Sequence, residues 1–151
     1  MEYRDQGQEP PAGVPRKVLV MDDDRMFCEM AAELLQYLGC ELVETAGGGE
    51  EAVEKFHEAQ ADGAPFDLVI LDLTVYTGRG GKQIINDLIQ LDPGVKAIVT
   101  SGYGSDPVML DHAAFGFFGA LRKPFRVAEL KLLLRRAAAL LPAAPGGCRG
   151  P

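Results

Sequence analysis

The chain has 151 residues, of which 47% are hydrophobic and 25% charged, a balance typical of one globular domain rather than of a disordered chain. Its net charge of −7 disfavours nucleic acid or an anionic membrane as a direct partner. No apolar run approaches the roughly 20 residues of a membrane span, and the N-terminus lacks a basic-then-apolar signal segment. The three cysteines form an odd set without a CxxC pair, so we expect reduced thiols and a cytoplasmic location.

The two ends of the chain differ from its middle. Residues 1–15 are polar, contain three prolines and two glycines, and are predicted to form a flexible arm or linker. Residues 142–151 are rich in glycine and proline and are predicted to be a disordered tail. The expected domain therefore comprises residues 16–141.

Short apolar runs alternate with helix-period patterns through this domain. The runs predict strands at residues 18–21, 40–44, 68–71, 95–99 and 117–121. The helical patterns predict helices at residues 27–38, around 52–56, and at 84–89, 106–114 and 127–141. Strand and helix thus alternate five times, and right-handed crossovers between such units give a parallel sheet with helices on both faces. The predicted fold class is a doubly wound, five-stranded α/β fold with three αβα layers.

The third predicted strand, residues 68–71, is the most informative one. Four consecutive apolar residues are typical of a strand that is buried on both faces of a parallel sheet. Asp72 follows at the C-terminal end, where α/β folds bind their ligands, whereas Asp67 precedes the strand and belongs to the other edge. From this stretch alone, Asp72 is equally consistent with a helix or turn cap and with a functional group.

Polar side chains also follow the other strands of the predicted sheet. They are Asp22 and Asp23 after the first strand, Asp72 after the third, Thr100 and Ser101 after the fourth, and Lys123 after the fifth. A doubly wound sheet makes these strands neighbours, so we expect the groups to share one pocket. Residues 22–24 are all acidic, and a helix N-cap needs only one of them, so the others require a counter-charge.

The predicted pocket has the groups that phosphoryl chemistry requires. Three carboxylates repel one another and favour a hard divalent cation such as Mg²⁺, which binds carboxylates, carbonyls and water. A lysine and a hydroxyl complete a set that suits an incoming phosphoryl group, because its oxygens need positive charge and hydrogen-bond donors. A carboxylate in that position can itself act as the nucleophile and become an aspartyl phosphate.

Two glycine-containing segments invite other interpretations. A phosphate-binding loop of the GxxxxGK[ST] type would need glycine at 76 and Ser or Thr at 83, where the chain has Tyr76 and Gln83. We interpret residues 73–82 instead as a mobile loop that leads into a helix. Gly102 and Gly104 form a GxG pair without a third glycine, which disfavours a dinucleotide site.

Taken together, the strand-end motifs resemble those of the receiver domains of two-component response regulators. They read Val-Leu-Val-Met-Asp-Asp-Asp at 18–24, Leu-Asp-Leu-Thr at 71–74, Thr-Ser-Gly at 100–102 and Lys-Pro-Phe at 123–125. The resemblance covers residues 16–141. It implies the flavodoxin-like receiver fold, with strand order 2-1-3-4-5.

The resemblance also implies roles for the acids. Asp72 would be the phosphoacceptor, taking a phosphoryl group from a phosphohistidine. Asp23 would bind Mg²⁺ directly and Asp22 largely through water, with the Thr74 carbonyl as the third protein ligand beside Asp72. Receivers usually carry a proline shortly after the phosphoacceptor, and this chain departs from that pattern with Tyr76.

Two further residues match the family's phosphoryl-binding positions. Thr100 would be the switch hydroxyl, and Lys123, joined to Pro124 by a cis peptide bond, would pair with the phosphoryl group. The aromatic residue that often lies three positions before this lysine is replaced by Ala120. Tyr103 offers another aromatic ring close by, either as a simple loop anchor or as a group that changes environment on activation.

More narrowly, the residues that make up these motifs are similar to those in the C-terminal receiver of hybrid sensor histidine kinases. This likeness implies a histidine kinase or a histidine phosphotransfer domain as partner, and it leaves a homodimer open. It implies no direct contact with nucleic acid or membrane. A receiver catalyses its own aspartyl phosphorylation and dephosphorylation, and the chain contains no kinase motif.

Three alternatives remain at the sequence level. The first is a protein-interaction module of the same fold that works without phosphorylation. The second is a phosphatase of the haloacid dehalogenase type, which needs a second aspartate where this chain has Thr74. The third is a flavodoxin, which needs a Ser/Thr/Gly-rich phosphate loop where the first predicted strand ends in acids.

Overall fold

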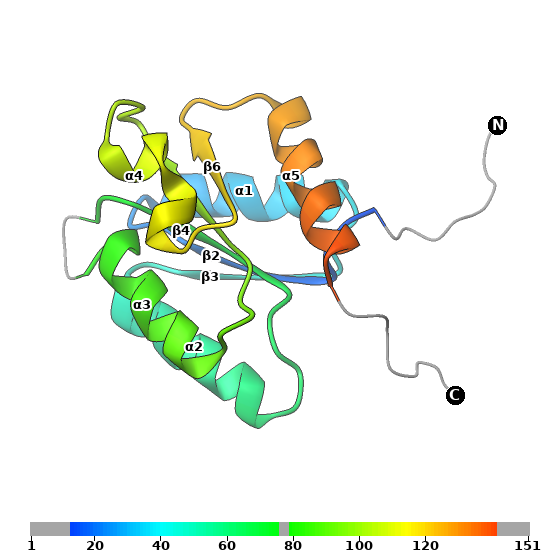
Figure 1. Cartoon of the computed structure of the whole chain (residues 1–151). Coiled ribbons are helices and arrows are strands. Elements are labelled where there is room, and N and C mark those ends of the chain that lie inside the picture. Colours follow the sequence, from blue (N-terminus) through cyan, green and yellow to red (C-terminus); the bar gives the residue numbers. More distant parts are fainter. Residues whose placement is uncertain (1–12, 76–78, 142–151) are drawn as a thin grey trace, which may run out of the picture.

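The computed structural model describes residues 13–75 and 79–141, and within them five parallel strands form one sheet (Figure 1). The strands are β2 (Lys17–Met21), β3 (Leu42–Ala46), β4 (Leu68–Asp72), β5 (Ala97–Ser101) and β6 (Gly119–Arg122). Their spatial order is β3-β2-β4-β5-β6, which is the order 2-1-3-4-5 in chain sequence. The predicted fold class and strand order are therefore confirmed.

Helices cover both faces of this sheet. They are α1 (Arg25–Tyr37), α2 (Gly49–Ala61), α3 (Gly81–Leu91), the one-turn α4 (Pro107–Leu110) with the 3₁₀ turn η1 (His112–Phe115), and α5 (Val127–Ala139). Figure 1 shows α2 and α3 on one side of the sheet and α1 and α5 on the other. The result is the three-layer arrangement that the alternation of elements predicts.

The alternation of side chains along β2 explains the two halves of the core. Val18 and Val20 pack with the inner faces of α1 and α5, whereas Leu19 and Met21 pack with those of α2 and α3. All five residues of β4 are buried, as are all five of β5, because helices cover both of their faces. The central position of β4 follows directly from its uninterrupted apolar sequence.

Several boundaries differ from the predicted ones. The strand expected at 95–99 begins two residues later, because Val95 donates its backbone N–H to the Asp92 carbonyl and so belongs to the preceding turn. The strand expected at 40–44 also begins later, since the Cys40 N–H closes the end of α1 by bonding to the Leu35 carbonyl. The last strand starts at Gly119, because the Phe117 N–H bonds to the His112 carbonyl.

The helix predicted at 106–114 is shorter than expected. Asp106 caps α4 by accepting the Val108 N–H at 2.9 Å, but the helix ends after a single turn. Asp111 has φ −138° and ψ 57°, which lies outside the helical region, and a separate 3₁₀ turn follows it. Gly116, with φ +96°, then reverses the chain toward β6.

The two ends of the predicted domain are described only in part. Residues 1–12 and 142–151, which make up most of the predicted arm and tail, lie outside the described residues, so the boundaries at 15 and 141 stay predictions. Asp67 lies at the edge opposite Asp72, as expected, and its Oδ2 accepts the backbone N–H groups of Arg16 and Lys17. No helix in the described parts of the chain is both long and apolar enough to cross a membrane.

Candidate functional site

Three carboxylates meet at the C-terminal edge of the sheet. Met21 and Leu71 are paired across β2 and β4, so the residues that follow them, Asp22 and Asp72, emerge side by side. Asp22, Asp23 and Asp72 each have a carboxylate oxygen within 4.8 Å of the others. Asp22 is 1% exposed and Asp72 6% exposed, so two of the three charges are withdrawn from water.

These carboxylates form part of a hollow of about 200 Å³, which we call the acid pocket. Its lining residues are Asp22, Asp23, Asp24, Asp72, Thr74, Ser101, Gly102, Tyr103 and Lys123. They come from the loops after β2, β4, β5 and β6. The convergence that the strand order predicts is therefore present.

Lys123 supplies the counter-charge that the acid triplet requires. Its Nζ lies 2.5 Å from Asp22 Oδ2 and 3.4 Å from Asp72 Oδ1. The same ammonium lies 4.2 Å from the centre of the Phe27 ring, in a cation–π contact. The peptide bond between Lys123 and Pro124 is cis, as the family resemblance implies.

Burial and charge together shift the protonation of this cluster. Burial, with the negative charge of Asp22 added to it, raises the pKa of Asp72 to about 6, although Lys123 opposes this shift. Burial would lower the pKa of Lys123, but the hydrogen bond and charge of Asp22 and the charge of Asp72 outweigh it and raise that pKa. The lysine therefore stays an ammonium, while Asp72 is a more basic carboxylate than usual.

Asp24 has a different task from its two neighbours. Its Oδ1 accepts the Phe27 N–H at 3.2 Å, which makes it the N-cap of α1. Its own N–H donates to Asp22 Oδ1 at 2.9 Å and thereby helps to orient that carboxylate. One acid of the triplet thus caps the helix, as expected, and the other two face the pocket.

The two hydroxyls at the end of β5 are also distinguished by the structure. Thr100 is paired with Asp72 across β5 and β4, is 1% exposed, and its Oγ1 has no hydrogen-bond partner among the described residues. The Ser101 Oγ accepts the Tyr103 N–H at 3.0 Å. A buried hydroxyl without a partner is costly, so the Thr100 hydroxyl is available to a new partner near Asp72, although Thr100 is not among the described residues that line the acid pocket.

The segment after Asp72 contributes more to the site than the sequence indicates. Thr74 is exposed and lines the pocket, whereas Tyr76 lies outside the described residues. A Cβ on Gly81 would lie 2.9 Å from the Asp72 carbonyl oxygen, so the absence of a side chain lets α3 begin directly against Asp72. Arg79 forms ion pairs with Asp87 and, at 3.7 Å, with Glu50, and sequence patterns did not reveal this contact.

The acid pocket has a donor set that fits Mg²⁺. Carboxylate oxygens are the ligands that this ion prefers, and it commonly takes only one or two of them and keeps several waters. Asp22, Asp23 and Asp72 offer three such oxygens within 4.8 Å of one another, two of them from nearly buried residues. The arrangement can therefore hold a small hard cation next to Asp72.

The comparison with protein families decides the broader identity. The family described as "Response regulator receiver domain" matches residues 18–135. The chain belongs to this receiver family. Its fold, strand order and acidic edge agree with that membership, which also removes the phosphatase and flavodoxin alternatives.

Individual relatives support the same assignment. The chemotaxis protein CheY of Thermotoga maritima is 29% identical over 111 residues, which cover 74% of this chain and 88% of that protein. CheY of Treponema pallidum is 28% identical over 131 residues, covering 87% and 86% of the two chains.

Solved structures show the same receiver architecture. The receiver domain of NtrX from Brucella abortus superposes with a TM-score of 0.71 at 26% identity, covering 82% of this chain and 99% of that one. CheY in the CheX–CheY–BeF₃–Mg²⁺ complex from Borrelia burgdorferi gives a TM-score of 0.71 at 25% identity, covering 86% and 92%.

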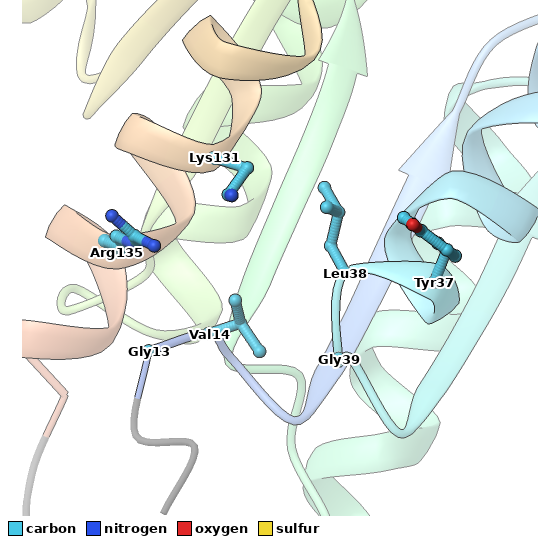
Figure 2. Close-up of a pocket in the computed structure, with 7 residues that line it drawn as sticks. All are labelled: Gly13, Val14, Tyr37, Leu38, Gly39, Lys131 and Arg135. Atoms are coloured by element: carbon cyan, nitrogen blue, oxygen red, sulfur yellow. The ribbon is translucent and has the colours of Figure 1, made fainter. Parts of the chain in front are cut away.

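A second hollow, of about 380 Å³, lies at the opposite edge of the sheet (Figure 2). It is lined by the end of α1, the residues that lead into β2, and two cations of α5, Lys131 and Arg135. The described residues that line it include no carboxylate and no paired nucleophile and base. The acid pocket is therefore the better candidate for chemistry.

Proposed function

We propose that this receiver accepts a phosphoryl group from a phosphohistidine onto Asp72 and changes conformation in response. The observation that carries the proposal is the placement of the Asp72 carboxylate 3.4 Å from the Lys123 ammonium and within 4.8 Å of two further acids. A carboxylate nucleophile, a fixed positive charge and a cation-binding acid pair are the parts that such a transfer needs.

The chain's own residues account for most of the transfer step. An Asp72 oxygen attacks phosphorus, the bond from phosphorus to the histidine nitrogen breaks, and that nitrogen keeps the electron pair. Lys123 already lies beside Asp72 and stabilises the charge on the phosphoryl oxygens. Thr100 donates its unpaired hydroxyl to one of these oxygens. The same pocket permits self-catalysed phosphorylation by a small donor and later hydrolysis.

Bound Mg²⁺, held by Asp22, Asp23, Asp72 and the Thr74 carbonyl, would supply further charge stabilisation. Asp22 already accepts hydrogen bonds from Lys123 and from the Asp24 N–H, which supports its assignment to a water-mediated role. We therefore expect Asp23→Ala to weaken Mg²⁺ binding more than Asp22→Ala, measured by titration calorimetry. The opposite order would contradict this division of roles.

The partner proposed is a helical domain that carries the donor histidine, as in a histidine kinase or phosphotransfer protein. An apolar groove of about 450 Å³ lies directly beside the acid pocket, and Lys123 lines both. Its other lining residues are Phe27, Met30, Leu34, Pro124, Phe125 and Val127. A helix laid in this groove would bring its histidine to Asp72. Met30→Glu should slow transfer from a phosphorylated kinase, and an unchanged rate would place the donor elsewhere.

The wider setting also remains a proposal. The similarity of the motifs to hybrid sensor histidine kinases supports a place at the end of such a kinase in the cytoplasm, with residues 1–15 as a linker. A homodimer stays open. The competing function is an interaction module that works without phosphorylation, and the presence of Asp72, Lys123 and the acid pair argues against it.

Labelling with acetyl phosphate tests the proposal. The full chain should show a retarded band on a Phos-tag gel in the presence of Mg²⁺ and none in EDTA, because the carboxylates would otherwise repel the donor. Asp72→Asn should abolish the band, whereas Asp62→Asn, an exposed position at the end of α2, should leave it intact. Labelling of the Asp72→Asn protein would contradict the assignment of Asp72 as the phosphoacceptor. Absence of labelling in the wild type would favour the interaction module.

A further inference from the structure

Among the described residues, one aromatic side chain lines the acid pocket. Tyr103 lies three residues beyond Thr100, and the other lining residues are acids, small polar residues, a glycine and Lys123. Its side chain is 66% exposed, which argues against a role as a packed loop anchor. A large ring left in solvent at the rim of a charged pocket therefore needs another explanation.

The backbone of Tyr103 is fixed although its ring is exposed. Its N–H donates to the Ser101 Oγ at 3.0 Å, and its carbonyl accepts the Asp106 N–H at 3.1 Å. The ring can thus change position by rotation about its own side-chain bonds, without a rearrangement of the loop. Such rotation is fast at exposed positions.

The backbone next to this ring faces open space. A Cβ built on Gly102 would meet no atom within 4 Å among the described residues other than its chain neighbours Ser101 and Tyr103. The pocket of about 200 Å³ has space for about seven waters at about 30 Å³ each. A phosphoryl group on Asp72 would displace only some of them, so water could still approach the phosphorus from within the pocket.

We propose that the Tyr103 ring covers the phosphorylated Asp72 and slows its hydrolysis by restricting the approach of water. This inference rests on the proposed function. In the hydrolysis step a water oxygen attacks phosphorus, the bond from phosphorus to the Asp72 oxygen breaks, and the carboxylate leaves with the electron pair. Inorganic phosphate carries away the water oxygen, and the water's proton passes to phosphate or solvent. The water takes the apical position that the donor nitrogen has vacated, so the ring can cover the phosphorus once the donor has left.

The lifetime of the phosphorylated protein tests this role. Wild type and variants are labelled with acetyl phosphate and Mg²⁺, freed of donor by desalting, and followed over time on Phos-tag gels. Tyr103→Ala should shorten the half-life about five-fold, which corresponds to about 1 kcal/mol in the barrier. Tyr103→Phe keeps the ring and should stay close to wild type, and Tyr103→Leu should fall between the two. The matched control is Tyr37→Ala, since Tyr37 is 86% exposed at the opposite edge of the sheet.

The outcomes separate this inference from the proposed function. Normal labelling of Tyr103→Ala with an unchanged half-life would overturn the role of the ring and leave the phosphoacceptor assignment standing. A Tyr103→Phe protein as short-lived as Tyr103→Ala would also overturn it, because the hydroxyl rather than the ring would then control the lifetime. No labelling of the wild type would overturn both.

Discussion

At the scale of single residues, buried carboxylates determine the electrostatics of the site. Asp22 is almost completely buried and has its closest charge partner in Lys123, at 2.5 Å. Asp72 has the longer contact with the same ammonium, at 3.4 Å, and is left partly uncompensated. A buried charge with incomplete pairing costs folding free energy, which is typical of groups reserved for reaction.

The raised pKa of Asp72 makes this cost dependent on pH. Its pKa rises from 3.8 to about 6 in the folded chain, so its charged form is less favourable there than in the unfolded chain. The cost is absent below about pH 3, where both states are protonated, grows as the pH rises from 3.8 to about 6, and is complete above the folded pKa. Asp72→Asn should therefore stabilise the protein at pH 7–8, by at most about 3 kcal/mol.

This gain should fade as the pH falls from 6 toward 4, and urea unfolding in EDTA at several pH values would measure it. Asp62→Asn, at an exposed position, is the matched control and should change little. An Asn variant that is less stable than wild type at pH 8, or whose advantage grows on acidification, would contradict the account.

At the scale of elements, the start of α3 is fitted against the end of β4. A Cβ on Gly81 would approach the Asp72 carbonyl oxygen to 2.9 Å and the Leu71 Cβ to 3.4 Å. Contacts this close to backbone force a shift, so α3 and the end of β4 are positioned together. The ion pairs of Arg79 with Glu50 and Asp87 link the same segment to α2 and along α3.

Gly81→Ala tests this coupling of helix and strand. We expect a loss of about 1–3 kcal/mol in the free energy of unfolding, because the added methyl has no space. We also expect weaker labelling by acetyl phosphate, since Asp72 would be displaced. Gly94→Ala is the matched control: its Cβ would make only an ordinary contact of 3.5 Å, so a change within about 0.5 kcal/mol is expected. A change at Gly81→Ala as small as that expected for Gly94→Ala would show that α3 tolerates a methyl at this point.

At the scale of the whole molecule, sequence periodicity predicted the alternation of strands and helices and the parallel sheet, whereas the strand order came from the family resemblance. The uninterrupted apolar run of β4 indicated a central strand, and parallel crossovers then placed Asp22, Asp72, Thr100 and Lys123 at one edge. Features that depend on particular backbone contacts were not predictable in this way. The early end of α4 at Asp111 is one example, because residue types alone do not reveal a departure from helical angles.

The glycines around the start of α3 show again that sequence patterns do not reveal particular backbone contacts. From sequence they indicated a mobile loop, yet Gly81 packs against the Asp72 carbonyl. A glycine pattern permits either flexibility or close backbone approach, and only the neighbouring strand decides between them. Likewise, the sequence could place Thr100 and Ser101 together but could not show which hydroxyl lacks a partner.

The most direct test of the central proposal is to locate the phosphoryl group chemically. The full chain is labelled with acetyl phosphate and Mg²⁺, and the acyl phosphate is reduced with borohydride, which converts a phosphorylated aspartate to homoserine. Peptide mass spectrometry then identifies the position. We expect homoserine at position 72 and at neither 22 nor 23, because Asp22 is already held by the Lys123 ammonium and the Asp24 N–H, whereas Asp72 has a raised pKa and only the longer contact with Lys123. Homoserine at 22 or 23, or at no position despite labelling, would contradict it.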